Sequence, residues 1–216
     1  MTDPAPNDVD GTTGAPRGER PAPGRPRDPA LDEAIITATR RRLVLDGYSK
    51  MTLGDIAADA GVSRPTLYRR WPGKLALVVD ALDWGLRAQL QAYPTDDLSD
   101  REPFEAFLEA VRRVDPRYAN PDAIVLQANF MGEVTRVPEL LDILRERAVE
   151  PRMAALRAVI LDLQQRGAVR AEVDVETVVT MCFGSYFGAF LRHGEDDVEL
   201  ADKVATELWR GLAVTA

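Results

Sequence analysis

The sequence is short of the residues on which most enzymes and metalloproteins depend. Its 216 residues include one cysteine, Cys182, and one histidine, His193. A single cysteine excludes an intramolecular disulfide, and one Cys with one His cannot complete an ordinary zinc site. A Cys or Ser nucleophile normally needs a histidine base that a third group orients. No glycine-rich phosphate-binding loop is present either. We therefore expect no metal, no cofactor and no catalysis.

Long apolar runs are also absent. No stretch of about 18 apolar residues is available to span a bilayer, and the N-terminal residues carry no apolar segment of the signal-peptide type. We therefore expect a cytoplasmic protein that makes no membrane contact. Hydrophobic residues form 45% of the 216-residue chain, which is enough to bury the core of one large domain or two small ones.

Apolar side chains are almost missing from residues 1–28, which are rich in Pro and Gly. Such a composition cannot bury enough surface to offset the entropy of ordering, so we predict a disordered tail. Its arginines either keep the tail soluble or reach toward DNA, and the sequence leaves both possibilities open. We assign residues 29–92 to one domain and residues 93–216 to a second, with the boundary in the loop YPTDDLSD.

Strand signals are absent after the tail, whereas apolar residues recur at helical spacing. We predict an all-α protein of about nine to ten helices, with an N-terminal three-helix helix-turn-helix domain and a C-terminal helical bundle. Proline at the starts of helices and glycine at their ends set most boundaries. The predicted helices cover residues 29–45, 52–59, 64–70, 74–92, 101–114, 120–131, 137–147, 151–166, 174–192 and 197–213.

Two of these helices are separated by only a short turn. Thr52 and Asp55 resemble a capping box at the start of the first, and Ser63 is a good N-cap for the second. Pro65 is tolerated in a first helical turn, and Gly61 supplies the bend between the helices. This is the helix-turn-helix plan. The outward side of the second helix then carries hydroxyl and guanidinium groups suited to phosphate oxygens and base edges.

The stretch MTLGDIAADAGVSRPTLYRRWPGKLALVVDAL, with GY just before it, resembles the DNA-binding domain of TetR-family transcriptional repressors. The resemblance covers residues 30–92, while residues 93–216 match the family only in length and helical pattern. The stretches RGAVRAEVDVETVV and FGSYFGAFLRHGE are similar to those of actinobacterial members. It implies these DNA-binding residues: Thr52, Ser63, Arg64, Pro65, Thr66, Tyr68, Arg69, Arg70 and Lys74.

The resemblance also distributes roles among these residues. Phosphate contacts are implied for Thr52, Tyr68, Arg70 and Lys74. Base contacts are implied for Arg64, Pro65 and Thr66, with Arg64 making bidentate hydrogen bonds to a guanine. Arg69 is expected at a base or a phosphate.

The negative charge of the chain is unevenly placed. Residues 25–92 hold eleven basic and eight acidic side chains, a net charge of +3, whereas residues 93–216 hold fourteen and twenty-three, a net charge of −9. One domain of charge +3 binds DNA weakly, so we expect two of them on the two half-sites of a palindromic operator in double-stranded DNA.

The resemblance implies a homodimer and a small-molecule effector for the second domain. Small residues in the helices at 151–166 and 174–192 favour a two-fold helical interface, and the alternative is packing within one chain. The expected interface residues are Ala155, Val159, Leu163, Gly184, Phe187 and Gly188. Aromatic and methionine side chains would suit a hydrophobic effector. The candidate pocket residues are Trp84, Phe104, Phe107, Phe130, Met131, Met153 and Tyr186.

These features favour a sequence-specific DNA-binding transcriptional regulator, a repressor that a small hydrophobic effector releases from its operator. Two other classes compete with it. One is a non-catalytic binding module whose helix-turn-helix serves protein interaction, for which DNA binding would be absent or insensitive to salt. The other is an all-helical enzyme, which the lone His193 and lone Cys182 disfavour.

Overall fold

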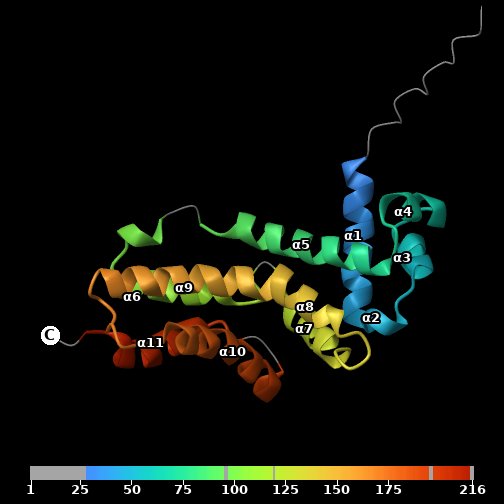
Figure 1. The fold of residues 1–216 in the computed structure, drawn as a ribbon. Coiled ribbons are helices and arrows are strands. Elements are labelled where there is room, and N and C mark those ends of the chain that lie inside the picture. The colour runs from blue at the N-terminus through green and yellow to red at the C-terminus, as the bar shows by residue number, and fades with distance from the viewer. Residues whose placement is uncertain (1–27, 95–96, 119, 195–196, 215–216) are drawn as a thin grey trace, which may run out of the picture.

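A computed structural model describes residues 28–94, 97–118, 120–194 and 197–214. Every regular element in these ranges is a helix, which confirms the all-α prediction (Figure 1). The predicted tail lies outside the described residues except for Asp28, whose carboxylate caps the first helix by accepting a hydrogen bond from the N–H of Ala30 at 3.1 Å.

The N-terminal helices are α1 (Pro29–Leu45), α2 (Gly47–Lys50), α3 (Leu53–Asp59), α4 (Arg64–Arg70) and α5 (Lys74–Ala92). A short 3-10 helix, η1 (Leu98–Asp100), which the sequence does not predict, leads into the rest of the chain. The remaining helices are α6 (Pro103–Val114), α7 (Ala123–Gly132), α8 (Glu139–Leu144), η2 (Arg145–Val149), α9 (Glu150–Gln165), α10 (Val175–His193) and α11 (Leu200–Leu212).

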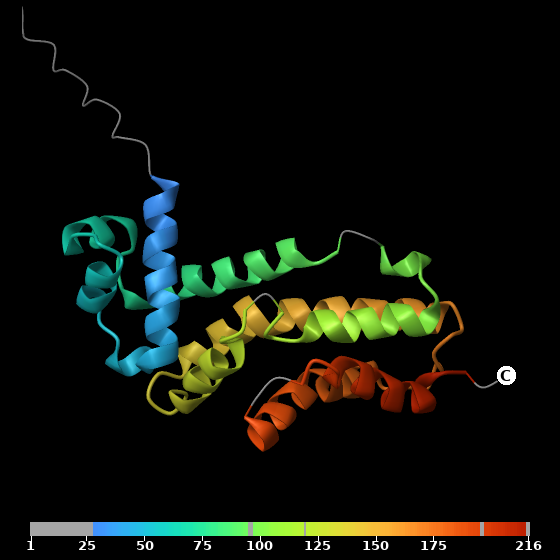
Figure 2. The same ribbon diagram turned by 180° about the vertical axis from the view of Figure 1, so that it is seen from behind.

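The helices form a long body with α1 standing across one end (Figures 1 and 2). On one side of α1 lie α3 and α4, and on the other side α5 extends along the body above α6 and α9. A separate layer below α6 and α9 contains α10 and α11. The first helices of the chain are therefore at one end, and the last two occupy the lower face.

Two hydrophobic cores hold this arrangement together. The first lies under the helix-turn-helix and includes Leu43, Ile56 and Leu67, which have no exposed surface. Phe130 of α7 and Leu140 of α8 belong to the same core. The packing boundary therefore does not coincide with residue 92, because helices from the second half of the chain complete the first core.

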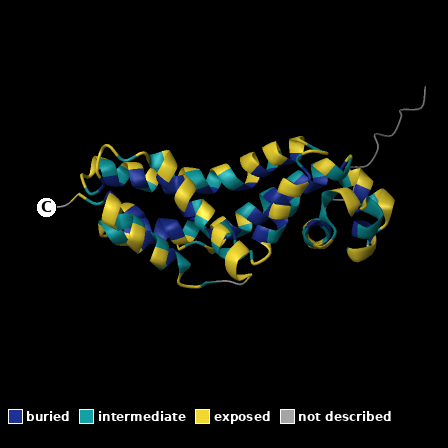
Figure 3. Ribbon diagram, turned by 90° about the horizontal axis from the view of Figure 1, so that it is seen from below, coloured by how far each residue is buried: buried dark blue, intermediate teal, exposed yellow. Residues whose placement is uncertain are grey.

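The second core lies between α6, α9, α10 and α11. Phe107, Ile160 and Cys182 are fully buried there, with Tyr186 close to full burial. The hydroxyl of Tyr186 donates to the carbonyl of Val111 at 2.7 Å, so this buried polar group is satisfied. Figure 3 shows buried residues on the inward sides of the helices and exposed residues along the outside.

Helix boundaries differ from the prediction most clearly at Pro151. The sequence predicts a break before it, but α8, the π-helical η2 and α9 follow one another continuously. Proline lacks an N–H and its ring displaces the carbonyl four residues earlier. A wider turn just before it provides the room, since the N–H of Glu150 donates to the carbonyl of Arg145 five residues back.

None of the helices in the described ranges has the combination of length and hydropathy that crossing a membrane requires.

Candidate nucleic-acid interface

The helix-turn-helix forms with the predicted caps. The hydroxyl of Thr52 accepts a hydrogen bond from the N–H of Asp55 at 3.1 Å and donates one to the Asp55 carboxylate at 2.6 Å. Both groups of this pair are therefore fixed at the start of α3. The Ser63 hydroxyl likewise accepts from the N–H of Thr66 at 3.3 Å and lies 2.9 Å from its hydroxyl. These two caps set where α3 and α4 begin.

The turn between the helices depends on one backbone conformation. Gly61 has a φ of +66°, a region that side chains with a Cβ rarely adopt. The N–H of Val62 then donates to the carbonyl of Ala57 at 2.9 Å and closes the turn. Leu67 inserts from α4 into the core, and this buried side chain and the Ser63 cap help to fix the position of the seven-residue helix.

The opposite side of α4 is uncovered. Arg64, Pro65, Tyr68 and Arg69 are exposed, and 54% of the Tyr68 surface is accessible. The guanidinium of Arg64 lies against the backbone of Gly54 in α3, where a Cβ would collide with it. A single face therefore presents two guanidinium groups and a phenol, which are donors for phosphate oxygens and base edges.

Two of the expected phosphate contacts have partners inside the protein instead. Arg70 forms an ion pair with Asp32 of α1, and only 10% of its side chain is exposed. The ammonium of Lys74 donates to the carbonyls of Tyr48 at 2.7 Å and Met51 at 3.2 Å. Burial lowers the pKa of Lys74, with Glu133 acting in the opposite direction. In the structure without DNA both side chains therefore hold parts of the domain together, and their contacts with phosphate stay a prediction.

Several contacts that the sequence did not predict connect the helix-turn-helix to the rest of the chain. Arg42 of α1 binds Asp59 of α3 through two hydrogen bonds of 2.6 and 2.8 Å. The Glu133 carboxylate at the end of α7 accepts from the hydroxyl of Ser49 at 2.6 Å and from its N–H at 3.2 Å. These hydrogen bonds lower the pKa of Glu133. The amide of Asn129 adds hydrogen bonds to two carbonyls at the end of α1.

The seven candidate pocket residues do not line one cavity, which corrects that prediction. Phe130 belongs to the first core, whereas Phe107 and Tyr186 are buried in the second. Met131 is 46% exposed on α7. The three others lie apart: Phe104 and Met153 pack at the edge of the second core, and Trp84 packs beside the first. Aromatic composition alone could not separate core from pocket.

A cavity of about 300 Å³ lies elsewhere, between α5, η1, α6 and α9. Its walls are mostly apolar, and Arg152 and Tyr93 contribute polar groups. Neither residue is among those that the sequence indicates as pocket candidates. The sequence does mark Arg152 as an arginine without an ion-pair partner on its own helix, because no acidic residue stands three or four positions from it. The remaining lining residues are Leu90, Asp97, Leu98, Ala110, Arg113, Val114, Pro151, Ala155, Leu156 and Val159.

The expected interface residues face different directions. Leu163 is fully buried in its own protomer's core, so its assignment to the interface is wrong. Ala155 and Val159 line the cavity beside α5. Gly184 and Gly188 are exposed on the outer side of α10, with open space where a Cβ would stand. Phe187 is half-buried next to them and contacts Phe183.

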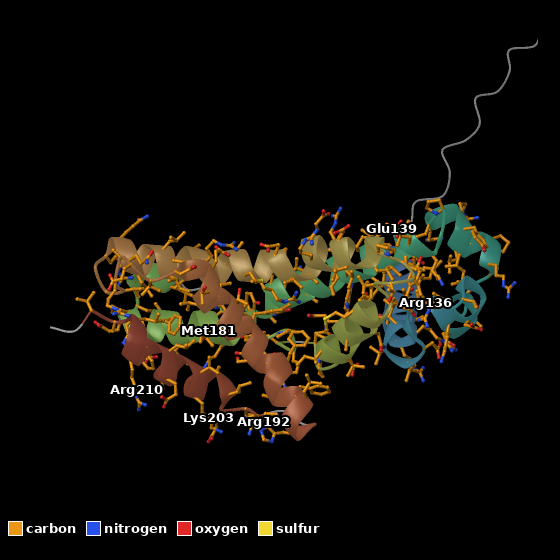
Figure 4. The ribbon with its side chains drawn as sticks, turned by 60° about the horizontal axis from the view of Figure 1, so that its bottom comes forward. Arg136, Glu139, Met181, Arg192, Lys203 and Arg210 are labelled. Atoms are coloured by element: carbon orange, nitrogen blue, oxygen red, sulfur yellow. The ribbon has the colours of Figure 1, made fainter. Side chains whose placement is uncertain are left out.

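Figure 4 brings this outer side of α10 forward and shows Met181 on it, with Lys203 and Arg210 projecting from α11 nearby. Met181 is 51% exposed and Leu191 is 83% exposed. Arg136 and Glu139 mark the far end of the body, where the α7–α8 connection approaches α1 and α2. The apolar stripe on α10 is therefore well separated from the exposed face of α4.

These features define a class of protein. A tight helix-turn-helix with an uncovered basic recognition helix, joined to a larger helical domain, is the architecture of a helix-turn-helix DNA-binding regulator.

In the ranges that the structure describes, no group of three or more His, Cys, Asp or Glu residues is placed to hold a metal ion.

Comparisons with known proteins identify the family. Residues 35–81 match the family model for bacterial regulatory proteins of the tetR family, and residues 99–208 match the model for the tetracyclin repressor-like C-terminal domain. An HTH-type transcriptional regulator of Mycobacterium tuberculosis is 32% identical over 155 residues, which is 72% of this chain and 71% of the relative. The DNA-binding transcriptional repressor TetR of Mycobacteroides abscessus is 25% identical over 145 residues, 67% of this chain and 74% of the relative.

Solved structures show the same fold at lower sequence identity. A TetR-family regulator from Mesorhizobium loti superposes with a TM-score of 0.70 at 19% identity, covering 88% of this chain and all of the other. A transcriptional regulator from Saccharomonospora viridis in complex with choline gives a TM-score of 0.67 at 16% identity, covering 87% of this chain and all of the other. The chain belongs to the TetR family and is a non-enzymatic, DNA-binding transcriptional regulator.

Proposed function

We propose that this protein is a homodimeric repressor that binds a palindromic operator through α4 and leaves it when a small molecule enters the C-terminal domain. The exposed face of α4 carries the first part of the proposal. Arg64 and Arg69 are exposed and form no ion pair with the described residues, although the Arg64 guanidinium rests on the backbone of Gly54. Both guanidinium groups are therefore available to DNA.

The outer side of α10 supports the dimer. Met181, Gly184, Gly188 and Leu191 are exposed and spaced by three or four residues, so they form one stripe along the helix. We call this stripe the α10 face. Its two glycines leave room for the backbone of a second α10 related by a two-fold axis. Two helix-turn-helix domains held in this way would meet two half-sites.

A continuous helix supports coupling between the effector and DNA. α5 begins directly after the recognition helix, at Lys74, and reaches the 300 Å³ cavity with Leu90. Lys74 is hydrogen-bonded to the carbonyls just before α3. A shift of α5 in response to a ligand therefore displaces the helix-turn-helix. The ligand changes operator affinity only if it binds the two arrangements of α5 with different affinities.

The Saccharomonospora viridis regulator provides a precedent for a small molecule in this fold, because its structure contains choline. For the present chain, the proposed effector site is the cavity against α5. The expected hydrophobic effector agrees with the leucine, valine, alanine and proline side chains that form most of its wall.

Selection of sequences from a random DNA pool by the full-length protein tests the proposal. We expect a palindrome whose half-sites lie about 34–36 Å apart, or a multiple of that spacing. Arg64→Ala should lower specific affinity by about 1–3 kcal/mol per half-site and relax base preference. Arg145→Ala is the control, because Arg145 is exposed on η2 and, among the described residues, forms an ion pair with Asp142 alone.

The outcome separates the competing functions. Enrichment of a palindrome with a steep dependence on salt supports the operator-binding regulator. No enrichment, together with binding that ignores salt, would instead support a protein-interaction role for the helix-turn-helix. Equal losses for Arg64→Ala on specific and random DNA would refute the assignment of Arg64 to a base.

A further inference from the structure

Arg152 of α9 is a buried cation whose hydrogen-bond partners are all uncharged. Only 5% of the residue is exposed. Its guanidinium donates to the side-chain oxygen of Gln89, at 2.8 Å from Nε, and to the carbonyl of Ala148. No carboxylate of the described residues lies within ion-pair distance of it. An unpaired charge in this position is unfavourable, because nearly all of its water has been removed.

None of the ionisable groups near Arg152 forms an ion pair with its guanidinium. The Asp115 carboxylate is held by Arg117, at 3.1 Å from its Nε. Burial raises the pKa of Tyr93 to about 12, so its phenol stays neutral near pH 7. Burial likewise lowers the pKa of Arg152 to about 10, which still leaves it charged at neutral pH. The charge of Asp115 acts on Arg152 from a distance and opposes the effect of burial on its pKa, but no carboxylate of the described residues hydrogen-bonds to the guanidinium.

Arg152 also lines the cavity between α5, η1, α6 and α9. The apolar wall there includes Leu98, Val114 and Leu156. Among the other charged lining groups, Arg113 forms an ion pair with Glu109 at 2.8 Å, whereas Asp97 is exposed to solvent and accepts from the N–H of Ser99 at 3.0 Å. The cavity therefore combines a mostly apolar wall with one buried guanidinium that forms no ion pair with the described residues.

We propose that this cavity takes a small organic carboxylate, with the carboxylate on the Arg152 guanidinium and the apolar part against the leucine and valine wall. This inference rests on the proposed effector function and names the chemical class of the effector. A carboxylate matches the planar fork of a guanidinium and supplies the missing charge. A cation of the choline type is disfavoured by the same guanidinium.

The ligand would also compete for a contact that holds α5. Gln89, which is on α5, supplies the oxygen that Arg152 now binds, and its amide donates to the carbonyl of Asp115 at 3.0 Å. A carboxylate that takes over the guanidinium frees Gln89 from α9. The change occurs on the helix that leads back to Lys74 and the recognition helix.

The test is a titration series with three probes of equal chain length: octanoate, octan-1-ol and octylammonium. Octanoate and octylammonium are kept below their micelle-forming concentrations, and octan-1-ol below its solubility limit. Calorimetry on the full-length protein measures each dissociation constant. Charge-assisted hydrogen bonds add enough for octanoate to bind about tenfold to a hundredfold more tightly than octan-1-ol. Octylammonium should bind more weakly than both.

Arg152→Met keeps an unbranched, flexible side chain, although a shorter one, and removes the charge. It should abolish the preference for octanoate over octan-1-ol, while Arg145→Met, on the exposed side of η2, should preserve it. Circular dichroism verifies that each variant is folded. If Arg152→Met does not fold, Arg152→Lys should retain part of the preference, since it keeps the charge without the fork.

The comparison of the three probes in the unsubstituted protein tests the carboxylate proposal even without a variant. Equal affinity for octanoate and octan-1-ol, tighter binding of octylammonium, or no binding of any probe would overturn the proposal. DNA selection is independent of these titrations. A protein that selects a palindrome but shows no carboxylate preference would refute this inference and leave the repressor proposal standing. A protein that prefers octanoate but selects no palindrome would refute the repressor proposal and leave the carboxylate site standing.

Discussion

Replacing Gly188 by alanine tests the α10 face, because two arrangements of the protein predict opposite signs. In a lone protomer nothing lies within 4 Å of the added methyl group. Alanine is a better helix former than glycine, so each substitution should stabilise the protomer by about 0.5–1 kcal/mol. The same reasoning holds for Gly184, one helical turn earlier on α10.

In a dimer built on the α10 face the added methyl groups enter a space that the partner backbone occupies. Overpacking of a tight contact costs about 1–3 kcal/mol, and a two-fold interface contains the substituted position twice. We therefore expect Gly188→Ala to weaken dimerisation by about tenfold or more, at 1.4 kcal/mol per factor of ten. The stabilisation of each protomer is a smaller effect of the opposite sign.

Sedimentation equilibrium measures the dimer dissociation constant, and urea unfolding at several protein concentrations measures stability. Gly132→Ala is the control, since Gly132 is also exposed with open space around it, but at the end of α7. It should leave the dimer unchanged. A Gly188→Ala variant that is more stable at every concentration and dimerises normally would refute close backbone contact at the α10 face.

Three further predictions use other contacts. Arg70→Ala removes the ion pair with α1 and should lower the free energy of unfolding by about 1–2 kcal/mol, measured in urea, whereas a fall of about one in the salt slope of DNA binding would show a phosphate contact instead. Hydrogen bonds from Ser49 lower the pKa of Glu133, so their stabilisation is present above the ordinary value near 4.5 and is lost as the pH falls through the lower folded value. Ser49→Ala should therefore flatten the loss of stability on acidification, and an unchanged acid unfolding curve would contradict this. Burial raises the pKa of Cys182 to about 12, so a thiol reagent at pH 8 should modify the native protein slowly and the urea-unfolded protein rapidly.

The sequence was sufficient for the features that depend on neighbouring residues. Thr52 and Ser63 cap the helices that their positions predict, and Gly61 adopts the left-handed conformation that the turn requires. Helical spacing of apolar residues was enough to establish an all-α chain. Local hydrogen bonds and backbone preferences act over three or four residues, so they can be read along the chain without knowledge of the fold.

The contacts that distinguish this chain join residues far apart in sequence, and only the tertiary structure supplied them. Arg70 looked like a phosphate ligand, yet α1 brings Asp32 against it. Leu163 looked like an interface residue, yet its helix turns that side into the protomer's own core. Arg152 meets Gln89 across 63 residues of sequence. Whether an aromatic side chain is core or pocket, and whether a guanidinium is paired or free, is decided by which helices pack against it, and the order of residues does not contain that information.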